Sequence, residues 1–138
     1  MPTRDSLISE LFLMYGLDRS GLIGFCWGGE MTFSSATQVR GLRAVVVFYG
    51  RSPKPLELVK DIQAPVLAHY GEKDPTVNPD IPGTEEAMKK YNKSYTYKIY
   101  PGAQHGFHAD TNPERYNPDA AKEAWTTTLA FFKRHLQA

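Results

Sequence analysis

The sequence predicts an α/β domain in which about four mainly parallel strands are flanked by helices. Two observations support this fold class. Stretches with helical and strand periodicity alternate along the chain, which is the pattern of a parallel sheet joined by helices. The run 44–49 is continuously apolar and rich in β-branched residues, as expected of a strand that is buried on both faces of such a sheet.

The individual elements follow from local patterns. Strands are expected at residues 21–25, 44–49, 65–70 and 95–100. Helices are expected at residues 5–16, 28–39, 55–61 and 84–91, and a last helix begins after residue 117. Thr84 is predicted to cap the fourth helix, because its hydroxyl can accept a hydrogen bond from the first turn.

The last helix has the clearest signals. Asn117 can cap it, and Pro118 lies in the first turn, where the missing N–H costs nothing. Its apolar positions form one stripe, which is predicted to be buried: Ala121, Trp125, Leu129, Phe132 and Leu136.

Length and composition restrict the class of protein. The 138 residues suit a single domain spanning 1–138, and the net charge of +1 indicates neither a nucleic-acid nor a membrane partner. No apolar run is long enough to cross a membrane, and the N-terminus does not resemble a signal peptide. Because a single cysteine cannot form an internal disulfide, a cytoplasmic location is expected.

The most informative segment is Gly24-Phe25-Cys26-Trp27-Gly28-Gly29. It joins a predicted strand to a predicted helix through glycines, which is the local structure of a nucleophile elbow, here with cysteine in place of the usual serine. Asp74 and His105 follow the third and fourth predicted strands. Since the carboxyl ends of parallel strands meet at one edge of the sheet, the three side chains are expected to lie together.

The chemistry of this set is that of a thiol hydrolase. Nucleophile, acid and histidine occur in the chain order of an α/β-hydrolase. His105 would accept the thiol proton of Cys26, and Asp74 would fix the imidazole tautomer. The helix N-terminus is expected to favour the thiolate, and the backbone N–H of Trp27 is expected to point at the developing oxyanion.

These motifs together resemble the dienelactone hydrolase family. The matching segments are the cysteine elbow and four others: Phe48-Tyr49-Gly50, His69-Tyr70-Gly71-Glu72-Lys73-Asp74, Tyr100-Pro101-Gly102-Ala103-Gln104-His105-Gly106-Phe107, and the final helix from Arg115-Tyr116-Asn117-Pro118 onward. The resemblance covers the chain from residue 20. It implies an α/β-hydrolase fold, Cys26, His105 and Asp74 as the catalytic triad, and small lactones or carboxylic esters as substrates. No cofactor is implied.

The chain departs from the family pattern before the elbow. Family members carry a long segment there, which supplies further strands, a second oxyanion donor, an acidic partner for the cysteine and an arginine for the substrate carboxylate. Residues 1–19 have no counterpart of these groups. The sequence therefore resembles the C-terminal half of a dienelactone hydrolase. A natural short protein, a remnant of a split gene and an engineered fragment all fit.

Several alternatives stay open at this stage. The chain is either a working ester or lactone hydrolase or an inactive scaffold with a relic triad. Tyr49 and Phe107 either line a substrate pocket with Trp27 or pack the core. A metal site at His105 and His108 is not expected, because two histidines without a third ligand bind metal poorly.

The predicted topology also bears on assembly. Consecutive parallel strands place their connecting helices on one face, so the final helix is left to cover the other. The strand before the elbow becomes an edge with unpaired backbone groups. A homodimer or higher oligomer is therefore expected.

Overall fold

The computed structural model describes residues 20–137, in which four strands form one sheet. The strands are β1 (Gly21–Phe25), β2 (Ala44–Phe48), β3 (Val66–Gly71) and β4 (Tyr95–Tyr100). They lie side by side in chain order, and every neighbouring pair is parallel. The predicted four-stranded parallel sheet is confirmed, and the helix expected at residues 5–16 lies outside the described residues.

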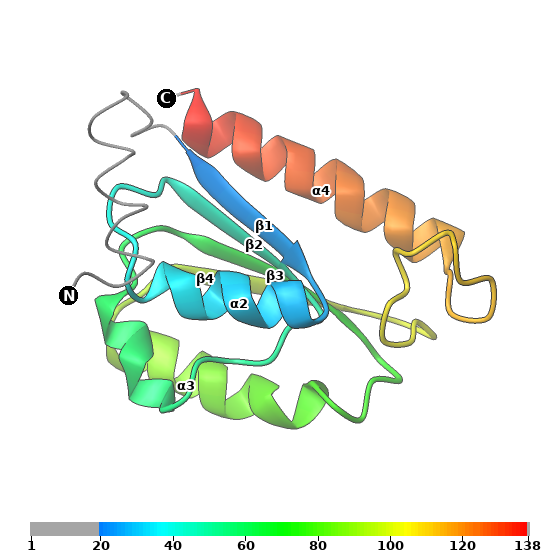
Figure 1. The fold of residues 1–138 in the computed structure, drawn as a ribbon, viewed down its shortest axis with the longest axis horizontal. Helices are drawn as coiled ribbons and strands as arrows, with labels where there is room; N and C mark the ends of the chain where they lie inside the picture. The colour runs from blue at the N-terminus through cyan, green and yellow to red at the C-terminus, as the bar shows by residue number, and fades with distance from the viewer. Residues whose placement is uncertain (1–19, 138) are drawn as a thin grey trace.

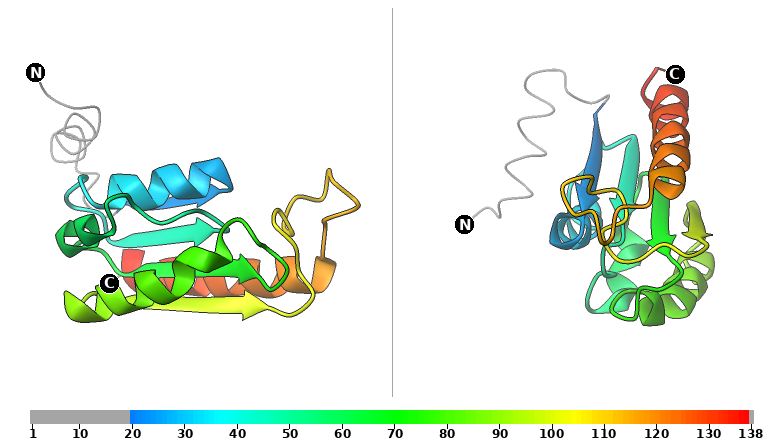
Figure 2. Two further views of the ribbon diagram at one scale, coloured as in Figure 1. Left: turned by 90° about the horizontal axis from the view of Figure 1, so that it is seen from below. Right: turned by 90° about the vertical axis from the view of Figure 1, so that its right-hand side faces the viewer.

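Helices cover both faces of this sheet. They are α2 (Trp27–Ala36), η1 (Leu56–Asp61), η2 (Asn78–Asp80), α3 (Ile81–Lys90) and α4 (Pro118–Leu136). Figures 1 and 2 show α2 and α3 on one face and α4 alone on the other. This is the arrangement that consecutive parallel strands impose on their connections.

Strand β2 lies at the centre of the core. All five of its residues are completely buried. Val45 and Val47 belong to the apolar cluster under α2 and α3, whereas Val46 and Phe48 belong to the cluster under α4. The continuous apolar run is thus explained, because alternate side chains of this strand fill two separate cores.

The start of α3 differs from the prediction. The helix begins at Ile81, with Pro82 in its first turn, so Thr84 lies inside it and is fully buried. The Thr84 hydroxyl donates to the carbonyl of Asp80 at 2.8 Å and also pairs with the hydroxyl of Ser52 at 2.5 Å. The threonine that was predicted to cap the helix therefore links it to the segment after β2.

Helix α4 begins as predicted but presents a different face to the sheet. The Asn117 side chain accepts from the backbone N–H of Ala120 at 3.1 Å, which confirms the cap. Trp125 and Leu129, however, are 41% and 52% exposed. The buried positions are small side chains: Ala120, Ala121, Ala124 and Thr128. Small residues let the helix lie close to the bulky aromatic core beneath it.

Two strands form the edges of the sheet among the described residues. β1 pairs only with β2, and β4 pairs only with β3. Ile23 on β1 is 37% exposed and Ile99 on β4 is 41% exposed. The expectation that the strand before the elbow is an edge strand holds within residues 20–137.

Candidate active site

Cys26 occupies the sharp turn between β1 and α2. Its backbone has φ 56° and ψ −125°, a conformation that costs a non-glycine residue roughly 1–3 kcal/mol. The Cys26 N–H donates to the carbonyl of Phe48 at 3.1 Å, and its own carbonyl accepts from Glu30 at 3.1 Å. The strained turn is therefore fixed to β2 on one side and to the first helical turn on the other.

Glycines make this turn sterically feasible. A Cβ atom on Gly24 would lie 2.2 Å from the carbonyl oxygen of Gly28, and one on Gly29 would lie 2.7 Å from that of Phe48. Real Cβ atoms do not approach carbonyl oxygens so closely, so both positions require glycine. This close approach brings the N-terminus of α2 against the ends of β1 and β2.

Asp74 and His105 form a tight pair at the same edge of the sheet. The His105 Nδ1 atom lies 2.6 Å from Oδ2 of Asp74, whose side chain is fully buried. The other carboxylate oxygen accepts from the backbone N–H groups of Thr76 at 3.0 Å and Val77 at 3.1 Å. One oxygen of the Asp74 carboxylate thus stabilises the turn that follows Asp74, and the other binds the imidazole. Because Nδ1 of His105 is bound to Asp74, Nε2 is the ring nitrogen that remains available.

The thiol of Cys26 is not poised as a thiolate. Burial raises its pKa, and the negative charge of Asp74 raises it further. The charge of Arg115 and the backbone N–H of Trp27 lower it, but they do not reverse the direction. The N-terminus of α2 thus acts in the expected direction, through the Trp27 N–H, but desolvation and the charge of Asp74 outweigh it, so the net pKa of the thiol is raised.

Cys26 and His105 are not hydrogen-bonded to each other in the structure. Within residues 20–137, no hydrogen bond links the Cys26 sulfur to His105, although both follow strands that end at the same edge of the sheet. Catalytic hydrogen bonds of this kind are often long in proteins without substrate and tighten on binding.

Trp27 presents its backbone rather than its ring to the thiol. As the first residue of α2, it has an N–H without a partner in the helix. That N–H lowers the pKa of the Cys26 thiol, so it acts directly on the sulfur. The indole itself is 73% exposed. The role of this N–H as an oxyanion donor stays a prediction.

A family model described as the dienelactone hydrolase family matches residues 11–136, which is most of the chain. The chain belongs to the dienelactone hydrolase family. The fold agrees with this membership: a dienelactone hydrolase-like crystal structure from Klebsiella pneumoniae subsp. pneumoniae is 30% identical, with a TM-score of 0.82 over 93% of this chain and 59% of that one.

Two curated relatives in this family carry lactone hydrolase names. A Saccharolobus solfataricus protein named as a carboxymethylenebutenolidase is 37% identical over 138 residues, covering 96% of this chain and 53% of that protein. A Bradyrhizobium protein named as a 2-oxo-3-(5-oxofuran-2-ylidene)propanoate lactonase is 35% identical over 130 residues, covering 86% and 52%. This dienelactone hydrolase family chain spans about half the length of these relatives.

Tyr49 and Phe107, the two aromatic residues proposed to line a pocket, both lie in the core. Phe107 is fully buried and packs edge-on against Tyr49 at a ring distance of 5.3 Å. Tyr49 has a positive φ of 36° and lies 5.1 Å from the His105 ring. The structure gives Phe107 a packing role, whereas a substrate role for Tyr49, beside the imidazole, stays a prediction.

Two residues near the site were not assigned a role from the sequence. The ring of His108 lies between those of Phe25 and Trp125, at 5.3 and 5.5 Å. Arg115 is the cation whose charge acts on the Cys26 thiol. Both lie in the segment that follows the carboxyl end of β4. Functional sites of parallel sheets lie at the carboxyl ends of the strands, and this rule, which predicted a role for His105, could also have indicated His108 and Arg115.

A third histidine lies in the core of the domain. His69 on β3 is fully buried, with Nδ1 at 3.0 Å from the Tyr100 hydroxyl and Nε2 at 2.9 Å from the Thr128 hydroxyl. Burial lowers its pKa to about 4. It is therefore neutral near pH 7, and it joins β3, β4 and α4.

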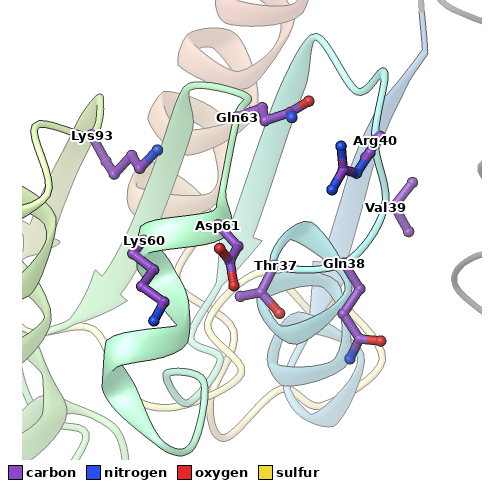
Figure 3. Close-up of a pocket in the computed structure, with 8 residues that line it drawn as sticks. All are labelled: Thr37, Gln38, Val39, Arg40, Lys60, Asp61, Gln63 and Lys93. Carbon is purple, nitrogen blue, oxygen red and sulfur yellow. The ribbon is translucent and has the colours of Figure 1, made fainter.

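A pocket of about 500 Å³ lies far from this chemistry. Figure 3 shows its lining, which comes from the end of α2, the end of η1 and the turn before β4: Thr37, Gln38, Val39, Arg40, Lys60, Asp61, Gln63 and Lys93. These segments precede β2, β3 and β4, so the pocket lies at the amino ends of the strands, opposite Cys26. Ligand sites of parallel sheets lie at the carboxyl ends, and we do not regard it as the active site.

Neither a metal site nor a membrane span was found in the described part of the chain. Residues 20–137 contain no cluster of three or more histidine, cysteine or acidic side chains suited to a metal ion. None of the helices in this range has both the length and the apolar character to cross a bilayer.

Proposed function

We propose that the chain hydrolyses small lactones or carboxylic esters with Cys26 as nucleophile, His105 as general base and Asp74 as the orienting acid. The observation that carries the proposal is the 2.6 Å contact between His105 and a fully buried Asp74 at the sheet edge that also holds the strained elbow. The lactonase names of the curated relatives support the substrate class.

In this mechanism the thiol is protonated at rest, in keeping with its raised pKa. The proton of Cys26 moves to Nε2 of His105 as Sγ attacks the carbonyl carbon, and the N–H of Trp27 stabilises the oxyanion. The C–O bond then breaks, and the alkoxide takes the proton from His105. Water then attacks the thioester carbon and gives a proton to the imidazole. The C–S bond breaks, the carboxylic acid is released, and Sγ takes that proton back from His105.

A second candidate function is an inactive scaffold that keeps the fold and the relic pair. It is favoured by the absence, within residues 20–137, of a hydrogen bond between the Cys26 sulfur and His105. Mass spectrometry after incubation with an activated ester separates the two. Acylation at Cys26 that is lost in Cys26→Ala and much slower in His105→Ala supports the hydrolase, whereas an unlabelled wild-type protein supports the scaffold.

We also propose that the chain forms a homodimer or a higher oligomer and that it is located in the cytoplasm. The outer edge of β1 has no strand partner within residues 20–137, and Ile23 on this strand is 37% exposed. Edges of this kind pair readily with another chain. Light scattering at micromolar concentration tests the assembly, and a folded monomer would contradict it. Small esters or lactones, not nucleic acids or membranes, are the proposed partners.

A further inference from the structure

A small hollow adjoins the candidate active site. It has a volume of about 230 Å³ and lies between the segment after β4 and the first turns of α4. Figure 2 shows that this segment extends beyond the arrowheads of the strands, at the end of the sheet where the elbow lies. This volume lies below the roughly 300–1,000 Å³ of clefts that hold drug-sized ligands, so the hollow suits one ring rather than a long chain.

His108 links the hollow to the aromatic core beneath the elbow, because it lines the hollow and its ring also packs against core rings. The His108 ring lies 5.3 Å from that of Phe25, the residue before Cys26, and 5.2 Å from that of Phe48. Its backbone N–H acts on the hydroxyl of Tyr49, a group whose pKa also responds to Cys26. One residue that lines the hollow therefore packs against the residue that precedes Cys26.

The lining of the hollow combines aromatic and charged side chains. Trp125 is 41% exposed and Tyr116 is 37% exposed, although both are large aromatic residues, and both face the hollow. Asp110 and Lys122 also line the hollow and carry opposite charges. Aromatic walls together with a few polar groups favour a planar ring stacked on the indole.

We propose that this hollow is a substrate subsite that receives an aromatic ring of the ester, held mainly by Trp125. The inference rests on the proposed hydrolase function and adds the substrate class: aryl-bearing esters are preferred over purely aliphatic ones. Loss of one aromatic contact of this kind corresponds to about a 2- to 10-fold change in affinity.

A binding experiment tests the subsite without requiring turnover. The chain has two tryptophans, one in the hollow and one, Trp27, beside the cysteine. Phenylacetamide, whose amide bond resists hydrolysis, is titrated into ¹⁵N-labelled protein. We expect the indole N–H signal of Trp125 to shift saturably and more than that of Trp27. An unmoved Trp125 signal at millimolar ligand would overturn the inference.

A kinetic experiment tests the preference. The ratio of kcat/KM for methyl phenylacetate or benzyl acetate to that for ethyl acetate is measured in the wild type and in three variants. We expect Trp125→Ala to lower the ratio about 2- to 10-fold for at least one aromatic ester. Trp125→Phe, which keeps a ring, should retain most of it. Leu129→Ala removes an exposed side chain one turn along α4, outside the hollow, and should not change the ratio.

The two arms separate the failures. Saturable binding at Trp125 without any turnover supports the subsite and refutes the proposed function. Turnover with a ratio that is equal in wild type and Trp125→Ala refutes the subsite alone. An equal fall of the ratio in Leu129→Ala also refutes it, since the effect would then come from the helix rather than from the indole.

Discussion

Buried His69 should make the stability of the protein depend on pH. The pKa of this imidazole is lowered from 6.5 to about 4 by burial, so the unfolded chain binds a proton that the folded chain excludes. A group with a lowered folded-state pKa of this kind stabilises the fold fully above pH 6.5 and progressively less as pH falls toward 4. Acid should therefore weaken the core at the junction of β3 and α4.

The size of the effect follows from the two pKa values. Relative to pH 8, the His69 contribution to the free energy of unfolding should fall by about 1.4 kcal/mol at pH 5.5 and about 2.6 kcal/mol at pH 4.5. These losses are large beside the roughly 5–15 kcal/mol that stabilises a typical domain. Burial of His108 lowers its pKa too, so the total loss should be larger still.

Urea unfolding at pH 8, 6.5, 5.5 and 4.5 measures this dependence, with His69→Gln as the matched variant. Glutamine can keep one hydrogen bond to Tyr100 or Thr128 but does not titrate. The wild-type advantage over the variant should shrink with falling pH by the amounts above. Parallel stability curves for the two proteins would refute the assignment of His69 as a buried neutral base.

Three further outcomes are expected. Asp74→Asn should lower kcat by about 10²- to 10⁴-fold, because an amide favours the wrong imidazole tautomer. An unchanged kcat in a variant with an unchanged circular dichroism spectrum would contradict the proposed triad. The rate of Cys26 alkylation should rise with pH, and the pH of its inflection should lie above that of a free cysteine, as the raised pKa implies. In Arg115→Ala the inflection should lie at a still higher pH, because a cation that lowers the pKa is lost. An inflection below that of free cysteine would contradict this. Gly24→Ala should destabilise the protein by about 1–3 kcal/mol through overpacking, whereas Gly28→Ala should be tolerated, because a Cβ there meets nothing within 4 Å. Equal urea midpoints for the two variants would contradict the steric reasoning.

The sequence predicted what local rules decide. The β-branched run of β2 and the cap at Asn117 depend on neighbouring residues alone, and both are confirmed. The pairing of Asp74 with His105 also followed, because chain order and the carboxyl-edge rule apply to any parallel sheet.

What the sequence could not predict depends on tertiary surroundings. The apolar stripe through Trp125 and Leu129 is real, but the bulk of the core beneath α4 selects the neighbouring face of small residues. The pKa of Cys26 is likewise decided by burial and by the charge of Asp74, which local patterns do not contain.

The sheet holds the three candidate site residues with different firmness. Asp74 follows β3, an interior strand that is buried along its whole length, whereas Cys26 and His105 follow β1 and β4, each paired on one side only within the described chain. Edge strands open first in native-state fluctuations, so amide protons of β1 and β4 should exchange before those of β3. A brief opening of either edge would separate Cys26 from His105 while the core remains folded. Any activity that needs both residues should therefore disappear at lower denaturant concentrations than the global fold.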